Sequence, residues 1–314
     1  MDINNYDNID NLVNVISKAI YKRVSEGTLE MAAETPAPSV APVSPAPALS
    51  FSAYPAAHAA VPGAALASRI DHTLLKADAT EEQVIALCQE ARSFGFSSVC
   101  VNTAYAPLAA GHLAGSGVTL SCVVGYPLGA TSTESKIAEA QEAVRCGAAS
   151  VEMVAHIGMI KSRNWNYVKT DIERVKQAVN GRAVLKVIIE TALLSEEEKI
   201  KAGTISKLIG VDIVKTSTGF SSRGATTADV RLLREAVGSD VRIEASGGIR
   251  TAAEAEALLQ AGADLIGTGN SISIVTGDVR AVDSGGHVCV GCGTCRQVGE
   301  CPTGKVDVIV ANNY

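Results

Sequence analysis

Two similar stretches decide the fold: Val184-Leu185-Lys186-Val187-Ile188-Ile189-Glu190 and Asp212-Ile213-Val214-Lys215-Thr216-Ser217-Thr218-Gly219. Each is an apolar run of strand length that carries a lysine. Strands of a parallel sheet are covered by helices on both faces, and lysine is rarely buried without a partner. Because one helix-length segment separates the two runs, we expect neighbouring parallel strands with the ammonium groups of Lys186 and Lys215 close together.

Such a pair of lysines predicts a reactive amine. Each positive charge lowers the pKa of the other, and burial lowers both pKa values further. A lysine that is partly neutral at pH 7 can attack a carbonyl carbon and form a Schiff base. The alternative for either residue is a strand-end lysine whose ammonium group reaches solvent, but the pairing and the polar residues that follow favour a functional site.

The segments around these strands alternate in the same way from Ala65 to Val275. Strand-like apolar runs are followed by runs with helical periodicity, and capping residues such as Thr80 and Ser195 precede acidic first turns. Strict alternation with eight strands predicts an α/β fold, a (β/α)8 TIM barrel. The alternative, a doubly wound open sheet, would have a glycine-rich first turn, which is absent here. The expected strands lie near residues 69–74, 97–101, 118–124, 150–155, 184–190, 212–216, 241–245 and 264–267.

Polar residues at the C-terminal ends of these strands are the candidate catalytic groups, because TIM-barrel active sites lie there. Asp71 on the first strand and Glu152 on the fourth join Lys186 and Lys215. A Schiff base with an aldehyde is an electron sink that permits carbon–carbon cleavage, and an acid/base group must then move the protons. Glu152 is the candidate for this role, and a structural ion pair with one of the lysines is its alternative.

Glycine-rich turns after the sixth, seventh and eighth strands predict a phosphate site. Phosphate in TIM barrels commonly binds backbone N–H groups of the last two loops and of a short extra helix, and glycine lets the backbone approach the oxygens. Together with the lysines, this site indicates carbon–carbon bond chemistry on a phosphorylated sugar. The candidate phosphate-binding residues are Gly219, Ser246, Gly247, Gly248, Gly269 and Ser271.

The N-terminal part of the chain differs in composition from the expected barrel domain, residues 65–278. Residues 1–28 carry apolar side chains at helical spacing and predict an amphipathic helix, and residues 29–64 are rich in Pro and Ala and predict an extended linker. A short helix on such a tether suggests docking into a groove of another protein through residues 7–26. The alternative is that the helix folds back on its own domain or oligomer.

Residues 279–314 form a tail in which Cys289, Cys292, Cys295 and Cys301 follow one another closely. Four such thiols in a cytosolic chain favour metal or cluster ligation over disulfides. Their spacing is close to that of ferredoxin-type iron–sulfur ligands, and four thiolates also suit zinc. An iron–sulfur cluster, zinc, and free or redox-active thiols stay open as alternatives.

Charge and hydropathy exclude other classes of function. The 314 residues carry a formal net charge of −6, which gives no electrostatic reason to bind nucleic acid or an anionic membrane. No apolar run reaches the roughly 18 residues of a membrane span, and the N-terminus lacks the order of a signal peptide. We therefore expect a cytoplasmic protein that binds neither nucleic acid nor membrane.

Several motifs taken together have a family resemblance. Residues 70–76, 99–102, 123–129, 185–191, 214–220 and 245–251 are similar, in this order, to stretches of class I deoxyribose-phosphate aldolases. The resemblance implies reversible cleavage of 2-deoxy-D-ribose 5-phosphate to acetaldehyde and D-glyceraldehyde 3-phosphate without a cofactor. It implies that Lys215 carries the Schiff base and that Lys186 and Asp71 belong to the polar network around it. It also implies a homo-oligomer, since dimers are frequent in the family.

Three residues depart from this family's pattern. Glu152 stands where the family has aspartate as the acid/base group, and the extra methylene moves the carboxylate by roughly 1 Å. His156 stands where asparagine is usual. Glu244 stands where the family has a lysine that lowers the pKa of the nucleophile, and an anion beside Lys215 favours the charged amine. The alternatives are therefore a catalytically altered or inactive barrel with a redox, metal-binding or assembly role, and a Schiff-base aldolase for a different sugar.

The N-terminal helix and linker resemble the encapsulation peptides that carry enzymes into bacterial microcompartments, where shell proteins bind them. This resemblance implies a location in the lumen of a microcompartment and a shell protein as partner. Such confinement suits acetaldehyde, which is small, reactive and membrane-permeant.

Overall fold

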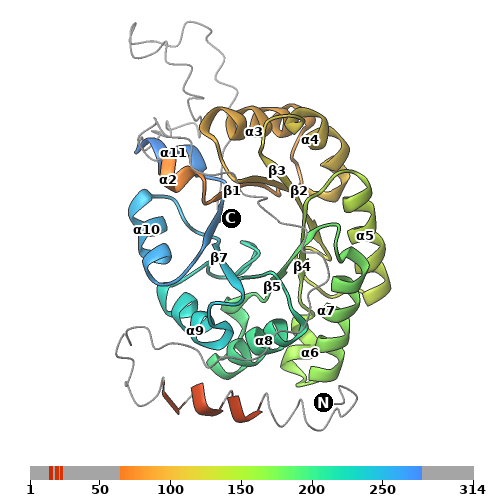
Figure 1. Cartoon of the computed structure of the whole chain (residues 1–314), viewed down its shortest axis with the longest axis vertical. Coiled ribbons are helices and arrows are strands. Elements are labelled where there is room, and N and C mark those ends of the chain that lie inside the picture. Colours follow the sequence, from red (N-terminus) through yellow and green to blue (C-terminus); the bar gives the residue numbers. More distant parts are fainter. Residues whose placement is uncertain (1–13, 17, 21, 24–63, 278–314) are drawn as a thin grey trace, which may run out of the picture.

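The computed structural model describes residues 14–16, 18–20, 22–23 and 64–277, and its central feature is a barrel of parallel strands (Figure 1). Each strand pairs with the next one along the chain, and β8 closes the sheet against β1. The TIM barrel predicted from the alternating pattern is confirmed. The strands are β1 (Ile70–Leu74), β2 (Ser98–Asn102), β3 (Thr119–Val124), β4 (Ser150–Val154), β5 (Val184–Ile188), β6 (Ile213–Lys215), β7 (Arg242–Ser246) and β8 (Leu265–Thr268).

Helices follow the strands and cover the outside of the barrel (Figure 1). Short elements that the alternating pattern did not predict are α2 (Ala64–Ala67), α6 (Ile157–Lys161) and 3₁₀ turns at Thr103–Tyr105 and Thr191–Leu193. These pieces are too short to give a periodic signal. The longer helices are α3 (Glu81–Phe94), α4 (Ala106–Leu113), α5 (Thr133–Arg145), α7 (Trp165–Val179), α8 (Glu196–Ile209), α9 (Thr227–Val237), α10 (Ala252–Gln260) and α11 (Ser271–Thr276).

Local sequence signals determine where these helices begin and end. The side chain of Thr80 accepts a hydrogen bond from the backbone N–H of Gln83, whose side chain accepts one from Thr80 in return. Ser195 and Glu198 make the same reciprocal pair at the start of α8, which satisfies N–H groups that have no partner inside the helix. Gly95 ends α3 with a φ of 68°, a conformation that costs glycine little.

One layer of the barrel interior holds charged residues in place of apolar ones. The register of β4 and β5 places Glu152 beside Lys186, and that of β6 and β7 places Lys215 beside Glu244. All four side chains are buried, and so is Asp71 on β1. TIM-barrel interiors are usually filled by bulky apolar side chains. The pairing of charges, and not hydrophobic packing, therefore governs this layer.

The described N-terminal residues are helical and lie against the flank of the barrel, beside α8 (Figure 1). Lys201 of α8 donates a hydrogen bond from Nζ to Oδ1 of Asn14 at 3.2 Å, and the same ammonium group lies over the ring of Trp165. Ile20 packs against the hydrophobic core. This arrangement corresponds to the alternative in which the amphipathic helix folds back on its own domain.

Several of the sequence predictions fall on other parts of the chain. Nearly all of the expected linker, residues 29–64, lies outside the described residues, and so does the tail with Cys289, Cys292, Cys295 and Cys301. In the part of the chain that the structure describes, every helix is too short or too polar to cross a lipid bilayer.

A buried ion pair joins α5 to α7 on the outside of the barrel. Nζ of Lys136 lies 2.6 Å from Oδ2 of Asp171, and neither side chain is exposed to solvent. Thr133 donates a hydrogen bond to the other oxygen of the carboxylate at 2.7 Å. Each of these two buried charges is therefore neutralised by the other, and removal of one would leave the other buried without a partner.

Replacing Lys136 with methionine should lower the free energy of unfolding by about 3–5 kcal/mol, because the Asp171 carboxylate is left buried without its cation. The double variant Lys136→Met/Asp171→Leu should recover most of this loss. Denaturant unfolding measures both. As a control, Lys207→Met breaks the solvent-exposed pair with Asp240 and should cost less than about 1 kcal/mol. Equal losses in the single and double variants would contradict this account.

Candidate active site

Four buried side chains form a closed ring of ion pairs inside the barrel. Nζ of Lys215 lies 2.5 Å from Oε2 of Glu152 and 2.7 Å from Oε1 of Glu244. Nζ of Lys186 lies 2.9 Å from Oε1 of Glu152 and 2.7 Å from Oε2 of Glu244. The two carboxylates thus bridge the two ammonium groups, and positive and negative charges alternate around the ring.

Asp71 joins this ring from the opposite side of the barrel. Its Oδ2 lies 2.7 Å from Nζ of Lys186, and Ser98 donates a hydrogen bond to its Oδ1 at 2.6 Å. Ser121 donates in the same way to Oε1 of Glu152 at 2.5 Å. All four residues predicted from the sequence as catalytic therefore lie in one cluster, and Glu244 is its fifth charged member. The two lysines are neighbours, as expected, although the carboxylates separate their charges.

The expectation that the lysine pair lowers the pKa of Lys215 is wrong. Burial does lower the pKa of this lysine, but the carboxylates of Glu152 and Glu244 outweigh burial and hold the pKa well above its usual value. The reason is the composition of the cluster, in which three carboxylates surround two ammonium groups. The carboxylate of Glu244 therefore helps to raise the pKa of Lys215, as we expected of an anion at this position. Lys215 is charged in the absence of substrate.

Two carboxyl groups of the cluster, those of Glu152 and Asp71, titrate differently. Burial raises the pKa of Glu152, but Lys186 and Lys215 outweigh it and hold that pKa well below its usual range. Burial raises the pKa of Asp71 to about 7, because Lys186 offsets only part of the cost and the neighbouring carboxylates add to it. Asp71 is thus the carboxyl group of the cluster that gains a proton near neutral pH.

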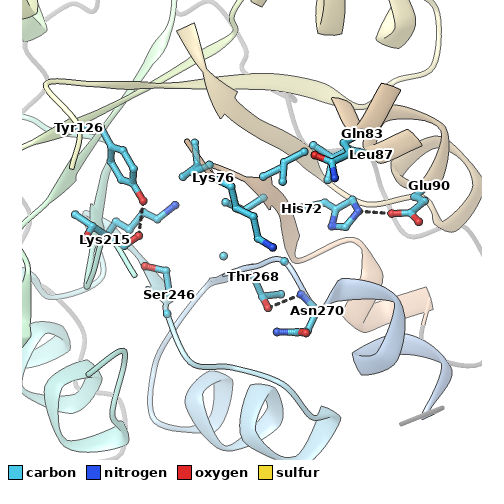
Figure 2. A pocket seen from close by; sticks show the side chains of 17 residues that line it. His72, Lys76, Gln83, Leu87, Glu90, Tyr126, Lys215, Ser246, Thr268 and Asn270 are labelled. Carbon is cyan, nitrogen blue, oxygen red and sulfur yellow. Dashed lines mark hydrogen bonds and ion pairs between the residues drawn. The ribbon is translucent and has the colours of Figure 1, made fainter. Parts of the chain in front are cut away.

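A pocket opens beside Lys215 at the C-terminal ends of the strands (Figure 2). Its wall includes Lys215, Tyr126 and Ser246 on one side and His72 on the other, with Lys76 between them (Figure 2). Lys186 is completely buried and does not line this pocket. Of the two lysines, Lys215 is therefore the one that a substrate can reach.

Three of the six predicted phosphate-binding residues line this pocket. Ser246, Gly247 and Gly269 line it. A methyl group added to Gly247 would lie 3.0 Å from Cα of Gly224 and 3.5 Å from Cα of Gly219, so the loops after β6 and β7 touch. Glycine at position 247, where φ is 84°, permits this close approach.

Ser271 and Gly248, which were also predicted to bind phosphate, do not line the pocket. The hydroxyl group of Ser271 is buried, donates to the backbone oxygen of Thr268 at 3.0 Å and lies 2.8 Å from Nδ1 of His72. The hydroxyl group of Ser271 therefore already forms hydrogen bonds within the protein. Gly248 follows Gly247 in the same loop with a φ of 75°, and neither Gly248 nor Ser271 is among the residues that line the pocket.

Three residues that were not among the predicted site residues shape the loop after β6. Tyr126 donates a hydrogen bond to the backbone oxygen of Thr218 at 2.5 Å, and Glu190 accepts one from its backbone N–H at 3.2 Å. A methyl group on Gly224 would lie 1.9 Å from the backbone oxygen of Gly247. The acidic residue at the end of β5 was a visible signal for Glu190, whereas no periodic pattern marks Gly224.

His156 lies outside the cluster of charges. Its Nδ1 accepts a hydrogen bond from the backbone N–H of Met159 at 3.3 Å, and so the imidazole caps α6. The ring also packs edge-on against Tyr167 at 5.4 Å between centroids. Asparagine, which is usual here in the family that the sequence resembles, is also a good N-cap, so this departure preserves a local structural role.

Cys100 is a potential metal ligand next to the cluster. Its Sγ and one oxygen each of Asp71 and Glu152 lie within 4.8 Å of one another, close enough to share an ion. However, Nζ of Lys186 already contacts both carboxylates, and burial, followed by the nearby anions, raises the pKa of the thiol well above its usual value. The lysine ammonium group thus takes the place of a metal cation.

The raised pKa of Asp71 predicts a pH-dependent stability. Because the folded protein binds this proton with a pKa of about 7 and the unfolded chain with one near 4, the stabilising contribution is lost as pH rises through this interval. The free energy of unfolding of the wild type, relative to Asp71→Asn, should therefore fall by up to about 4 kcal/mol between pH 4 and pH 8. Denaturant unfolding at several pH values measures the difference.

The exposed Asp78 provides the matched control for this experiment. Asp78→Asn should follow the wild type at every pH, because this side chain is exposed and lies outside the buried cluster of charges. Parallel curves for the wild type and Asp71→Asn would show that Asp71 does not titrate in this range.

The comparisons with known proteins agree with this geometry. Residues 65–273 match the family described as DeoC/LacD family aldolase. A deoxyribose-phosphate aldolase from Clostridium novyi is 52% identical over 208 residues, covering 66% of this chain and 94% of that protein, and one from a Geobacillus species is 49% identical over 212 residues, covering 68% and 95%. The tetrameric deoxyribose phosphate aldolase from Aeropyrum pernix has a TM-score of 0.63 and 35% identity, covering 68% of this chain and 91% of that chain. The chain therefore belongs to the DeoC/LacD family of aldolases.

Proposed function

We propose that the chain is a Schiff-base aldolase that reversibly cleaves 2-deoxy-D-ribose 5-phosphate into acetaldehyde and D-glyceraldehyde 3-phosphate. The observation that carries this proposal is the position of Lys215, which lines the pocket while its Nζ lies 2.5 Å from the carboxylate of Glu152. A nucleophile in contact with a proton-transfer group is the arrangement that covalent catalysis requires. The relatives that carry the name deoxyribose-phosphate aldolase support the choice of substrate.

In the cleavage direction, the amine of Lys215 attacks the aldehyde carbon of the sugar, and loss of water leaves an iminium. Glu152 accepts the proton of the hydroxyl group on the third carbon. The bond between the second and third carbons then breaks, and its electron pair moves toward the iminium nitrogen to give an enamine and D-glyceraldehyde 3-phosphate. Protonation of the enamine and addition of water release acetaldehyde and restore the lysine, so no cofactor is needed.

The other residues of the cluster and the loops have supporting roles in this proposal. Lys186 binds both Glu152 and Asp71 and holds the acid/base carboxylate in place. The substrate phosphate group would lie at the glycine-rich loops, against Gly247 and Gly269 with Gly219 close by. Backbone N–H groups of such loops bind phosphate oxygens without a charged side chain.

Borohydride trapping tests the nucleophile. Acetaldehyde and borohydride together should add one ethyl group to wild-type protein, and peptide mass spectrometry should locate it on Lys215, because reduction fixes the imine. Lys215→Met should not be labelled there and should lose turnover of 2-deoxy-D-ribose 5-phosphate by roughly a thousandfold or more. Lys207→Met, which removes a partly exposed lysine outside the site, is the control and should behave as wild type. Absence of label at Lys215 in the wild type would overturn the proposal.

Two alternatives follow from specific features of the site. The carboxylate of Glu244 at 2.7 Å from Lys215 favours a catalytically altered or inactive barrel with a redox, metal-binding or assembly role, and the trapping experiment separates this from an aldolase. A Schiff-base aldolase for a different sugar is separated by comparing turnover of phosphorylated and unphosphorylated deoxy sugars. A preference for the unphosphorylated sugar would favour this second alternative.

We also propose that the enzyme works in the lumen of a bacterial microcompartment and that its N-terminal helix, residues 7–26, binds a shell protein. In support, most of the described side chains of this helix are exposed, among them the apolar Val15 at 64%. Docking on a shell would exchange the contact with α8 for a contact with the partner. The helix on the barrel flank would then be the undocked state.

Deletion of residues 1–28 tests this location. The full chain should co-purify with microcompartment shells and the truncated chain should not, because an amphipathic helix supplies the docking surface. Lys201→Ala removes the ammonium group of α8 that donates to Asn14 and lies over the ring of Trp165, and it should co-purify at least as well as the full chain. Continued co-purification of the truncated chain would rule out the docking role.

The tail and the assembly remain predictions from the sequence. Binding of an iron–sulfur cluster or zinc by Cys289, Cys292, Cys295 and Cys301 is tested by metal analysis of the purified full-length chain. A homo-oligomer, either the dimer expected from the family resemblance or a tetramer like that of the Aeropyrum pernix protein, is tested by light scattering.

A further inference from the structure

Glu244 is completely buried and contacts the proposed nucleophile, which lines the pocket. Its Oε1 is 2.7 Å from Nζ of Lys215, and its Oε2 is 2.7 Å from Nζ of Lys186. Gly267, which lines the pocket, leaves space for these groups. A methyl group at this position would lie 2.6 Å from Oε1 of Glu244 and 3.2 Å from Nζ of Lys215, so the carboxylate and the amine meet where the pocket wall carries no side chain.

We propose that Glu244 is a catalytic base of this enzyme, which takes a proton from the ammonium group of Lys215 and returns it to the leaving hydroxyl group during imine formation. The inference rests on the proposed Schiff-base function. It gives a catalytic role to Glu244, the residue that departs most from the family's pattern. A base must lie within hydrogen-bond distance of the proton that it removes. Oε1 of Glu244 lies 2.7 Å from Nζ of Lys215 and makes no hydrogen bond within the described part of the chain, so it can receive that proton.

The steps balance in atoms and charge. A proton passes from Nζ of Lys215 to Oε1 of Glu244, which leaves a neutral amine and a carboxylic acid. The amine lone pair forms the carbon–nitrogen bond, the carbonyl electron pair moves to oxygen, and a proton moves from nitrogen to that oxygen. Glu244 then gives its proton to the hydroxyl group, which leaves as water while the nitrogen lone pair forms the iminium. The sum is ammonium plus aldehyde giving iminium plus water.

The surroundings of the two carboxylates decide which one removes the proton. Glu152 accepts hydrogen bonds from Lys215 and Ser121 and forms an ion pair with Lys186, and the lysines hold its pKa well below its usual range. Glu244 contacts the two ammonium groups without a hydroxyl donor. Oε1 of Glu244 has no hydrogen-bond partner among the described residues, so it has a lone pair available for the proton of Lys215. Glu152 then stays ionised for the later proton transfer from the substrate.

The resting state of Lys215 makes such a base necessary. The neighbouring carboxylates hold the pKa of this lysine well above its usual value, and loss of the proton to solvent would be rare near pH 7. Transfer of the proton to the carboxylate of Glu244, which contacts the amine, makes loss of the proton to solvent unnecessary. This transfer neutralises the ammonium group and the carboxylate at the same time.

The rate constant of imine formation on Lys215 tests the proposal. Full-length protein is mixed with acetaldehyde, quenched with borohydride at increasing times, and analysed for ethylation of Lys215 by mass spectrometry. At pH 7, Glu244→Gln should slow imine formation by about a hundredfold or more, whereas Glu244→Asp should retain part of the rate. Glu235→Gln, on the exposed face of α9, is the matched control and should equal wild type.

Chemical rescue distinguishes a base from a structural residue. Glu244→Ala should regain imine formation with added formate, in a saturable manner, because formate can enter beside Gly267 and supply the missing carboxylate. A Glu244→Gln variant as fast as wild type, or faster, would overturn the proposal and would mean that the anion only raises the pKa of Lys215. A slow Gln variant with no rescue of the Ala variant would also overturn it. Absence of imine in the wild type would instead overturn the proposed function itself.

Discussion

A closed ring of buried ion pairs is the constraint on which the site depends. Lys215, Glu152, Lys186 and Glu244 alternate in charge around it, and Asp71 joins it across the barrel. A charge without a partner in such an interior costs several kcal/mol. Removal of any member therefore leaves its neighbours uncompensated. The serine hydroxyl groups on β2 and β3 that donate to the carboxylates meet the same requirement, because buried carboxylate oxygens need donors.

The fold could be predicted from the sequence because its signals are local. The alternation of strand and helix patterns, and caps such as Thr80 and Ser195, depend on residues a few positions apart and were read correctly. Elements shorter than two turns have no such period, and α6 was missed for this reason. Its cap, His156, was noticed only as a departure from a motif. The sequence shows that position 156 is a histidine, but its role as a helix cap became clear only from the backbone of α6.

The residues of the site could be predicted from the sequence, but the charge state of Lys215 could not. Motif positions at strand ends indicated that Lys186 and Lys215 meet, and they are neighbours. The direction of the pKa shift on Lys215 was misjudged because it depends on how many carboxylates reach its Nζ. Asp71 reaches the cluster from across the closed barrel, 115 residues before Lys186. Closure of the sheet brings Asp71 and Lys186 into contact, and no pattern among residues close together in the sequence predicts this contact.

The excess of carboxylates is compatible with Schiff-base chemistry because the proposed protons move within the cluster. Transfer from Lys215 to Glu244 removes one positive and one negative charge together, and iminium formation restores both. Carbon–carbon cleavage neutralises the iminium while the substrate proton neutralises Glu152. The net charge of the buried group is therefore the same before and after each step. A barrel interior that tolerates no new unpaired charge can accept these changes, since each one is compensated within a few ångströms. An anion at position 244 then serves the reaction as a partner in proton exchange, where a cation would serve by keeping the amine neutral.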